Sequence, residues 1–179
     1  MMKVDPTLML LALPLLGVVF AAAAVAKLKG LDRFMGVVEQ YDLLPRVLVR
    51  PFAYALPVVE LGAALGLLLP VTRAPAALVL ILLLLAFAAA MAINLARGRS
   101  DIDCGCFIGV QKQRISWALV ARNLVLAGFG LTLLAEGSGR PLTALDGFTV
   151  VAAAASLLLL HEAIGRLFGL TPTVARRAS

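Results

Sequence analysis

APAALVLILLLLAFAAAMAINLA, residues Ala74 to Ala96, is an apolar run without a single charged residue. A helix needs about 20 such residues to cross a hydrocarbon core of about 30 Å. The run is long enough for that, and buried helices of soluble proteins are usually shorter. It therefore predicts a transmembrane helix, and the rest of the chain can be compared with it.

Similar runs lie on both sides of this one. They are Pro6–Ala26, Pro51–Thr72, Ile115–Ala135 and a shorter, weaker run at Gly147–Ile164. Only Lys3 precedes the first run as a basic residue, and the run is longer than the apolar part of a signal peptide, so we expect it to be a retained helix. The pattern predicts an all-α, polytopic membrane helical bundle with four to five transmembrane helices.

The overall composition agrees with a membrane protein. Of the 179 residues, 62% are hydrophobic and 15% are charged, whereas about a quarter are charged in a typical soluble domain. The lipid bilayer must therefore be the solvent for most of the surface. No linker separates a second domain, so residues 1–179 are predicted to form one integral membrane domain. The net charge of +6 lies at the ends of apolar runs, which indicates no nucleic-acid partner.

An amphipathic segment joins the first two runs, between Lys27 and Arg50. Its apolar residues recur at steps of three and four, with charged residues between them: the apolar set is Leu31, Phe34, Val37, Val38, Tyr41 and Leu44. This spacing is typical of a helix that lies on a membrane surface. Pro45 is expected to end that helix.

The basic residues predict an orientation. If the N-terminus lies outside, twelve of them fall on the inner side and three on the outer side, with Arg122 inside a span. The inner set is Lys27, Lys29, Arg33, Arg46, Arg50, Arg97, Arg99, Lys112, Arg114, Arg166, Arg176 and Arg177. By the positive-inside rule this places the loop between the third and fourth spans in the cytoplasm.

The only two cysteines, Cys104 and Cys106, lie in that loop with Gly105 between them. Residues two apart point to different faces of a helix, so a disulfide between them requires a turn or an extended local structure, and Gly105 gives the backbone the freedom for such a turn. A bridge that closes so short a loop stabilises a fold little, and strained bridges are readily reduced. Nearby basic residues favour the reactive thiolate. The segment therefore favours a redox pair, with soft-metal binding and inert buried thiols as the alternatives.

Three other polar residues are candidates for a supporting role. Glu60 and Arg122 lie within predicted spans, where charges are costly and often functional, and an ion pair between them would relieve both. Such a pair could serve only to stabilise the bundle, or it could take part in proton transfer. His161 could act as a base for a thiol, although a histidine near a helix end is more often a residue that reaches the interface.

Several motifs resemble a known family. Leu16-Gly17, Ala26-Lys27-Leu28, the Glu60 segment, Asp103-Cys-Gly-Cys-Phe107 and Arg122-Asn123 are similar to DoxX-like membrane proteins, and most specifically to the methylamine utilisation protein MauE family. The resemblance covers roughly residues 8–135. It implies a multi-pass protein of the bacterial cytoplasmic (inner) membrane that assists maturation of the disulfide-rich small subunit of methylamine dehydrogenase. It also implies a thioredoxin-like partner such as MauD and an exported, disulfide-containing client.

These features together predict a thiol–disulfide redox protein, with oxidoreductase activity as an open question. One alternative is a non-enzymatic membrane scaffold for redox partners, and another is a small soft-metal transporter. The sequence indicates no metal site, because two thiols and one histidine leave a tetrahedral site incomplete. It carries no cofactor motif either, and whether a quinone binds stays open.

Overall fold

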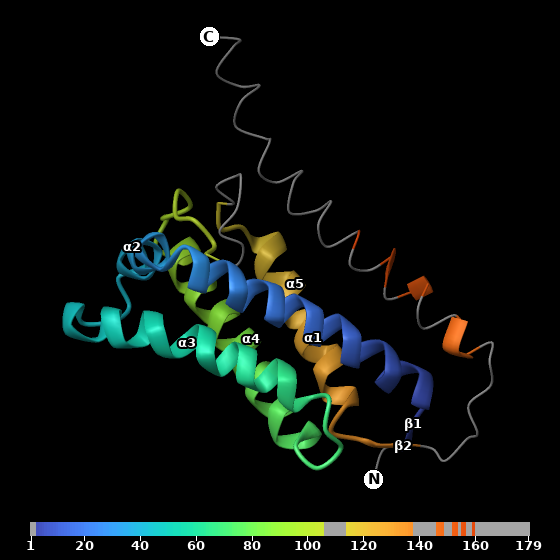
Figure 1. Cartoon of the computed structure of the whole chain (residues 1–179). Helices are drawn as coiled ribbons and strands as arrows, with labels where there is room; N and C mark the ends of the chain where they lie inside the picture. Colours follow the sequence, from blue (N-terminus) through green and yellow to red (C-terminus); the bar gives the residue numbers. More distant parts are fainter. Residues whose placement is uncertain are drawn as a thin grey trace.

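The computed structural model describes residues 3–105, 114–137, 146–148, 152–153, 155–156 and 159. The helices are α1 (Pro6–Lys29), α2 (Leu31–Tyr41), α3 (Arg46–Gly66), α4 (Arg73–Ala96) and α5 (Trp117–Thr132) (Figure 1). Strand β1 (Lys3–Val4) pairs in parallel with β2 (Glu136–Gly137), with Lys3 opposite Glu136. This short pairing ties the start of the described chain to the end of α5.

The described helices confirm the all-α membrane bundle. Among them α1, α3 and α4 are long and apolar enough to cross a membrane, whereas α5 is apolar but has 16 residues. Large apolar side chains such as Val58, Leu82 and Val125 point outward and are exposed by more than half. In water such a surface would aggregate, but in a bilayer it faces lipid. Most of the predicted fifth run, Gly147–Ile164, lies outside the described residues.

The second predicted span starts earlier in the structure than its apolar run does in the sequence. The sequence predicts a span over Pro51–Thr72, but α3 begins at Arg46 and ends at Gly66. Pro45 precedes its first residue, and the Pro45 carbonyl accepts the first helical hydrogen bond from Leu48 at 2.8 Å. Proline suits a helix start, where its missing N–H is not needed. Pro45 therefore begins α3 rather than merely ending the segment before it.

The core lies where helices α1, α3, α4 and α5 meet. Helix α4 packs most extensively against α5, and α1 packs against α3. Buried leucines and alanines from all four helices form the largest apolar cluster, which includes Leu16, Leu67, Leu80, Leu84 and Leu126. Small residues allow these helices to approach closely, as is usual in membrane bundles.

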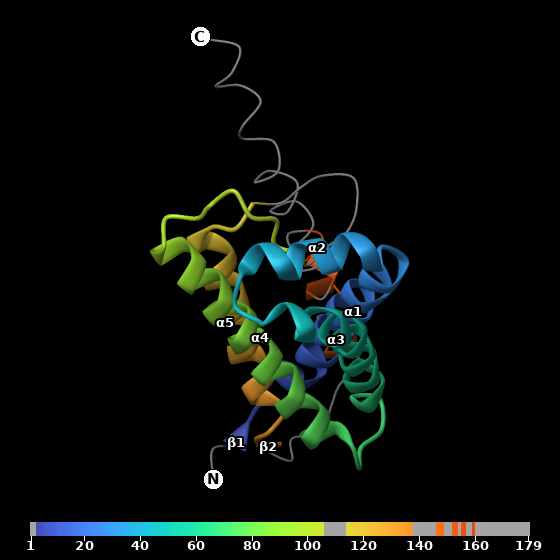
Figure 2. The same ribbon diagram turned by 90° about the vertical axis from the view of Figure 1, so that its left-hand side faces the viewer.

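Helix α2 lies across one end of this bundle (Figure 2). It buries Phe34, Val37 and Val38 and exposes Asp32, Arg33 and Glu39, as the amphipathic pattern predicts. It is shorter than the predicted segment because α1 continues to Lys29 and Asp42 turns left-handed, with φ of 52°. An aspartate tolerates this conformation and can end a helix.

The same end of the bundle collects the segments that carry most basic residues. The C-terminal ends of α1 and α4 meet there with α2, the start of α3 and the start of α5 (Figures 1 and 2). We call this the cysteine end, because the loop with Cys104 follows α4. Arg33, Arg46, Arg97, Arg99 and Arg114 all lie at it, whereas Arg73 begins α4 at the opposite end.

Candidate functional site

Cys104 lies in a loop whose base is closed by backbone pairing. The Ile115 amide donates to the Ile102 carbonyl at 2.9 Å, and Asp103 pairs with Arg114 in an antiparallel bridge. The side chain of Cys104 is buried in a cluster with Met91, which lies on α4, and Leu119, which lies on α5. The loop is thus held against the bundle, and it does not extend freely into the solvent.

Cys104 is disulfide-bonded in the structure. The sequence has one other cysteine, Cys106, which lies outside the described residues. Gly105 has a φ of +70°, a left-handed backbone conformation that glycine adopts readily. A Cβ on Gly105 would lie 2.9 Å from Cγ1 of Val37, so only glycine allows the loop to pack this closely on α2.

Hydrogen bonds attach the end of α2 to the cysteine loop and to α4. The Tyr41 hydroxyl donates to the Cys104 carbonyl at 3.5 Å, and Asn94 of α4 donates to the Tyr41 carbonyl at 3.1 Å. Arg99 donates to the Gln40 carbonyl at 2.7 Å. Burial, and then the negative charge of Asp103, raises the pKa of Tyr41 well above its ordinary value, so this residue stays a neutral donor.

Carboxylates partly balance the positive field that the sequence predicts around the cysteines. Arg114 pairs with Asp101 at 2.9 Å. Arg33 lies 3.9 Å from Asp103, and Arg99 lies 3.9 Å from Asp42. Because these contacts are partly exposed, each stabilises the fold little. They do reduce the net field at Cys104.

The buried charge of Glu60 is paired with Lys27, not with Arg122. The Lys27 ammonium donates to both oxygens of Glu60, at 2.7 and 2.8 Å, and the two side chains are 3% and 0% exposed. The Lys27 ammonium also lies 5.6 Å from the ring centres of Phe34 and Phe87, in reach of a cation–π contact. The predicted Glu60–Arg122 pair is therefore wrong.

The reason is the length of α1. The apolar run ends at Ala26, which suggested that Lys27 belongs to a loop, but the helix continues and places Lys27 against α3. Arg122 lies on α5 and forms no ion pair among the described residues; its Nε and Nη1 atoms have no hydrogen-bond partner there. His161 lies outside the described residues.

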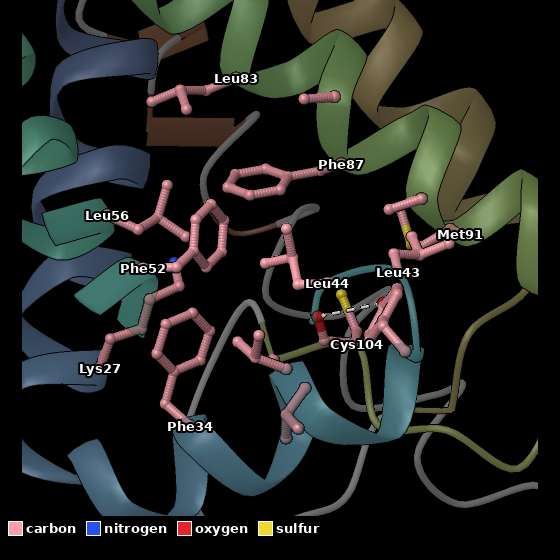
Figure 3. Close-up of a pocket in the computed structure, with 16 residues that line it drawn as sticks. Lys27, Phe34, Leu43, Leu44, Phe52, Leu56, Leu83, Phe87, Met91 and Cys104 are labelled. Atoms are coloured by element: carbon pink, nitrogen blue, oxygen red, sulfur yellow. Dashed lines mark hydrogen bonds between the residues drawn. The ribbon is translucent and has the colours of Figure 1, made fainter. Parts of the chain in front are cut away.

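A cavity of about 280 Å³ connects the two groups of polar residues (Figure 3). Lys27 and Phe34 line one side, and Cys104 and Met91 line the other. Phe52, Phe87, Tyr41 and leucines of α3 and α4 complete a wall that is mainly apolar and aromatic. Sequence reasoning missed this cavity and the pairing of Lys27 with Glu60. The position of Glu60 within a predicted span was a signal that a cation lies nearby, because a charge in a span usually has a partner.

The described residues offer little to a metal ion. In ranges 3–105 and 114–137, no three histidine, cysteine, aspartate or glutamate residues come together as metal ligands. The cavity has the composition of a site for an apolar small molecule, with few polar groups to orient it.

The fold and this site define an all-α membrane protein in which a disulfide-bonded cysteine lies beside an apolar cavity. Residues 5–136 match the family model for methylamine utilisation protein MauE. The methylamine utilization protein MauE of Methylorubrum extorquens is 45% identical over 148 residues, which is 80% of this chain and 78% of that protein. The MauE protein of Paracoccus versutus is 44% identical over 87% of this chain and 84% of its own length. This chain belongs to the MauE family. No solved structure matches it.

Proposed function

We propose that this protein is a thiol–disulfide exchange protein of the bacterial cytoplasmic membrane that acts in methylamine utilisation. Its relatives carry methylamine utilisation in their names, and its apolar helices suit a membrane. The observation that carries the chemistry is Cys104, which is disulfide-bonded in a loop held against a cavity. Cys106 is the only other cysteine in the chain, and we take it as the second member of the pair.

The proposed reaction is an exchange of one disulfide for another. A thiolate of the partner attacks one sulfur of the Cys104–Cys106 bridge, and the other sulfur leaves as a thiolate. A second partner thiol then resolves the mixed disulfide, so the partner gains a disulfide and this protein is left with two thiols. The reverse order uses the same steps. We propose a thioredoxin-like protein such as MauD as the partner and an exported disulfide-containing protein as the final client.

Cysteine replacement tests this proposal. In a host that grows on methylamine, we expect Cys104→Ser, Cys106→Ser and the double variant to prevent maturation of the disulfide-containing client and growth on methylamine. Ser100→Ala, an exposed position in the same loop, serves as the matched control and should grow normally. Each single cysteine variant should also trap the partner as a mixed disulfide that is visible on a non-reducing gel.

The outcome separates the proposal from its two alternatives. If the double cysteine variant still matures the client, the protein acts as a scaffold and the exchange proposal fails. If the purified protein instead holds stoichiometric metal that either cysteine variant loses, metal transport replaces exchange. We propose a structural role for Lys27 and Glu60: as a buried ion pair, they hold α1 and α3 together beside the cavity.

A further inference from the structure

We propose that the cavity between α2, α3 and α4 binds a membrane quinone, which accepts the electrons of the Cys104–Cys106 dithiol. This inference rests on the proposed exchange function and adds an electron acceptor and a direction to it. It starts from the position of Cys104 and Gly105 in the cavity wall, with Lys27 on the other side (Figure 3).

The wall suits a flat, apolar ring. Phe34, Phe52, Phe87 and Tyr41 bring aromatic side chains from α2, α3 and α4 around the same space. Aromatic rings favour stacked or edge-to-face contacts with another ring. A volume of about 280 Å³ fits a substituted quinone ring but leaves an isoprenoid tail outside. The cavity is therefore the size of a head-group site.

Two apolar residues of the cavity wall reach the protein surface. Leu43, in the connection between α2 and α3, and Phe52, near the start of α3, both line it, and both are more than one-third exposed. A tail that leaves the cavity there passes beside the outward apolar face of α3, which faces lipid in a bilayer. A water-soluble oxidant would gain nothing from this apolar edge, whereas a lipid-soluble one can enter there.

Two polar groups in the wall can orient a quinone oxygen. The Lys27 ammonium has three N–H groups, and Glu60 accepts from it at two oxygens, so one N–H remains among the described contacts. Its positive charge would stabilise the negative charge that develops on a quinone oxygen during reduction. The Tyr41 hydroxyl contacts the Cys104 carbonyl at only 3.5 Å, so it can turn to a better acceptor.

The reaction balances without a further reactant. Two thiols lose two electrons and two protons as the Cys104–Cys106 disulfide forms. The quinone gains two electrons and two protons and leaves as the quinol. The renewed disulfide can then oxidise the thioredoxin-like partner, so electrons flow from the client to the membrane pool.

The first experiment uses the purified full-length protein in lipid nanodiscs. The protein is reduced, freed of reductant and mixed with a short-chain ubiquinone, while quinone absorbance and free thiols are followed together. We expect one quinone to be consumed for each disulfide formed. An azido derivative of the same quinone should crosslink to peptides that contain Phe34 or Phe87.

Neighbouring alanines of α4 provide a matched pair of variants. Ala90 lines the cavity, whereas Ala89 is exposed and does not. We expect Ala90→Phe to slow quinone-dependent disulfide formation at least tenfold by filling the cavity, and Ala90→Leu to slow it less. Ala89→Phe should oxidise at the parent rate. Thermal unfolding of each variant shows whether the bundle is intact.

Two results would overturn the quinone site. One is a parent protein that exchanges disulfides with reduced thioredoxin but is not oxidised by the quinone, in which case exchange stands and the quinone site does not. The other is equal oxidation rates in folded Ala90→Phe and Ala89→Phe proteins. A parent protein that does not exchange with thioredoxin either would contradict the proposed function itself.

Discussion

Gly105 shows how one residue limits the position of the loop that carries Cys104. Two separate constraints apply to Gly105: its positive φ and its close approach to Val37. Another glycine, Gly98, has a positive φ without a close approach. Gly98 has a φ of +75° and nothing within 4 Å of an added Cβ. The two glycines therefore separate backbone strain from packing.

We expect Gly98→Ala to destabilise the protein by about 1–2 kcal/mol, which is the cost of the left-handed backbone for an L-residue. Gly105→Ala should cost more, because its Cβ also collides with Val37, and the loop should move away from α2. Dithiothreitol should then reduce the Cys104 disulfide faster in Gly105→Ala than in Gly98→Ala. Equal stability and equal reduction rates in the two variants would show that this close packing has no effect.

Lys27 and Glu60 form an ion pair that is almost completely buried, unlike the other ion pairs among the described residues. Removing one partner leaves a buried charge alone, which we expect to cost about 3–5 kcal/mol in Lys27→Met or Glu60→Leu. The double variant should recover most of that loss, since an apolar pair of similar volume needs no charge compensation. Unfolding in mixed micelles would give the free energies for a double-mutant cycle.

A parallel cycle with Arg122→Leu and Glu60→Leu is the control. Because Arg122 does not pair with Glu60, we expect those two effects to add within about 0.5 kcal/mol. A strong coupling between Glu60 and Arg122, with none between Glu60 and Lys27, would restore the pairing that the sequence suggested.

Helices α4 and α5 approach each other closely at Gly130. A Cβ on Gly130 of α5 would lie 2.7 Å from Cγ1 of Ile81 on α4, whereas a Cβ on Gly128 would meet nothing within 4 Å. Gly130→Ala should therefore destabilise the helix pair by about 1–3 kcal/mol through overpacking. Gly128→Ala should be neutral or stabilising by up to about 1 kcal/mol, because alanine favours a helix. Thermal unfolding in detergent compares the two, and equal shifts would contradict the close packing.

Helix α5 is also shorter than α1, α3 and α4, the helices long enough to cross a membrane. Its 16 residues span about 24 Å at 1.5 Å per residue, which is less than a typical hydrocarbon core. The apolar run that predicted it, Ile115–Ala135, is longer than the helix. The run starts with Ile115, whose amide is used to close the cysteine loop, so part of the apolar sequence serves the site and not the span.

The part of the molecule that the structure describes has a basic end and an end with fewer charges, and this predicts its orientation in a membrane. In a variant with both native cysteines replaced by serine, Ser100→Cys reports on the cysteine end and Val71→Cys on the opposite turn; both positions are exposed. By the positive-inside rule, an impermeant maleimide should label Ser100→Cys only in inverted vesicles and Val71→Cys only in intact cells. The opposite pattern would reverse the orientation.

This orientation bears on the proposed route of electrons. A cytoplasmic cysteine end would lie across the membrane from an exported client, so a relay through the bundle would have to connect them. Labelling of the reduced native cysteines in intact cells would instead support direct exchange with an external thioredoxin-like partner. Irregular backbone is tolerated at membrane depth where protein covers it, and the side chain of Cys104 is buried by protein.

The sequence by itself determined the long apolar helices α1, α3 and α4, the amphipathic α2 and the clustering of basic residues at one end of the described bundle. Each of these depends on hydropathy, charge or spacing within a single segment, and the cost of transferring a segment from water to lipid is largely a local property. The positive φ of Gly105 agrees with the backbone freedom that the sequence suggested at this glycine.

Only the tertiary structure decided which residues meet. The pairing of Lys27 with Glu60 depends on how far α1 continues and on which face it turns to α3, and no local pattern contains that information. The same holds for the cavity, whose wall combines α2, α3, α4 and the cysteine loop. A buried charge will pair with whichever opposite charge the packing brings within reach, because leaving it alone in an apolar interior costs several kcal/mol.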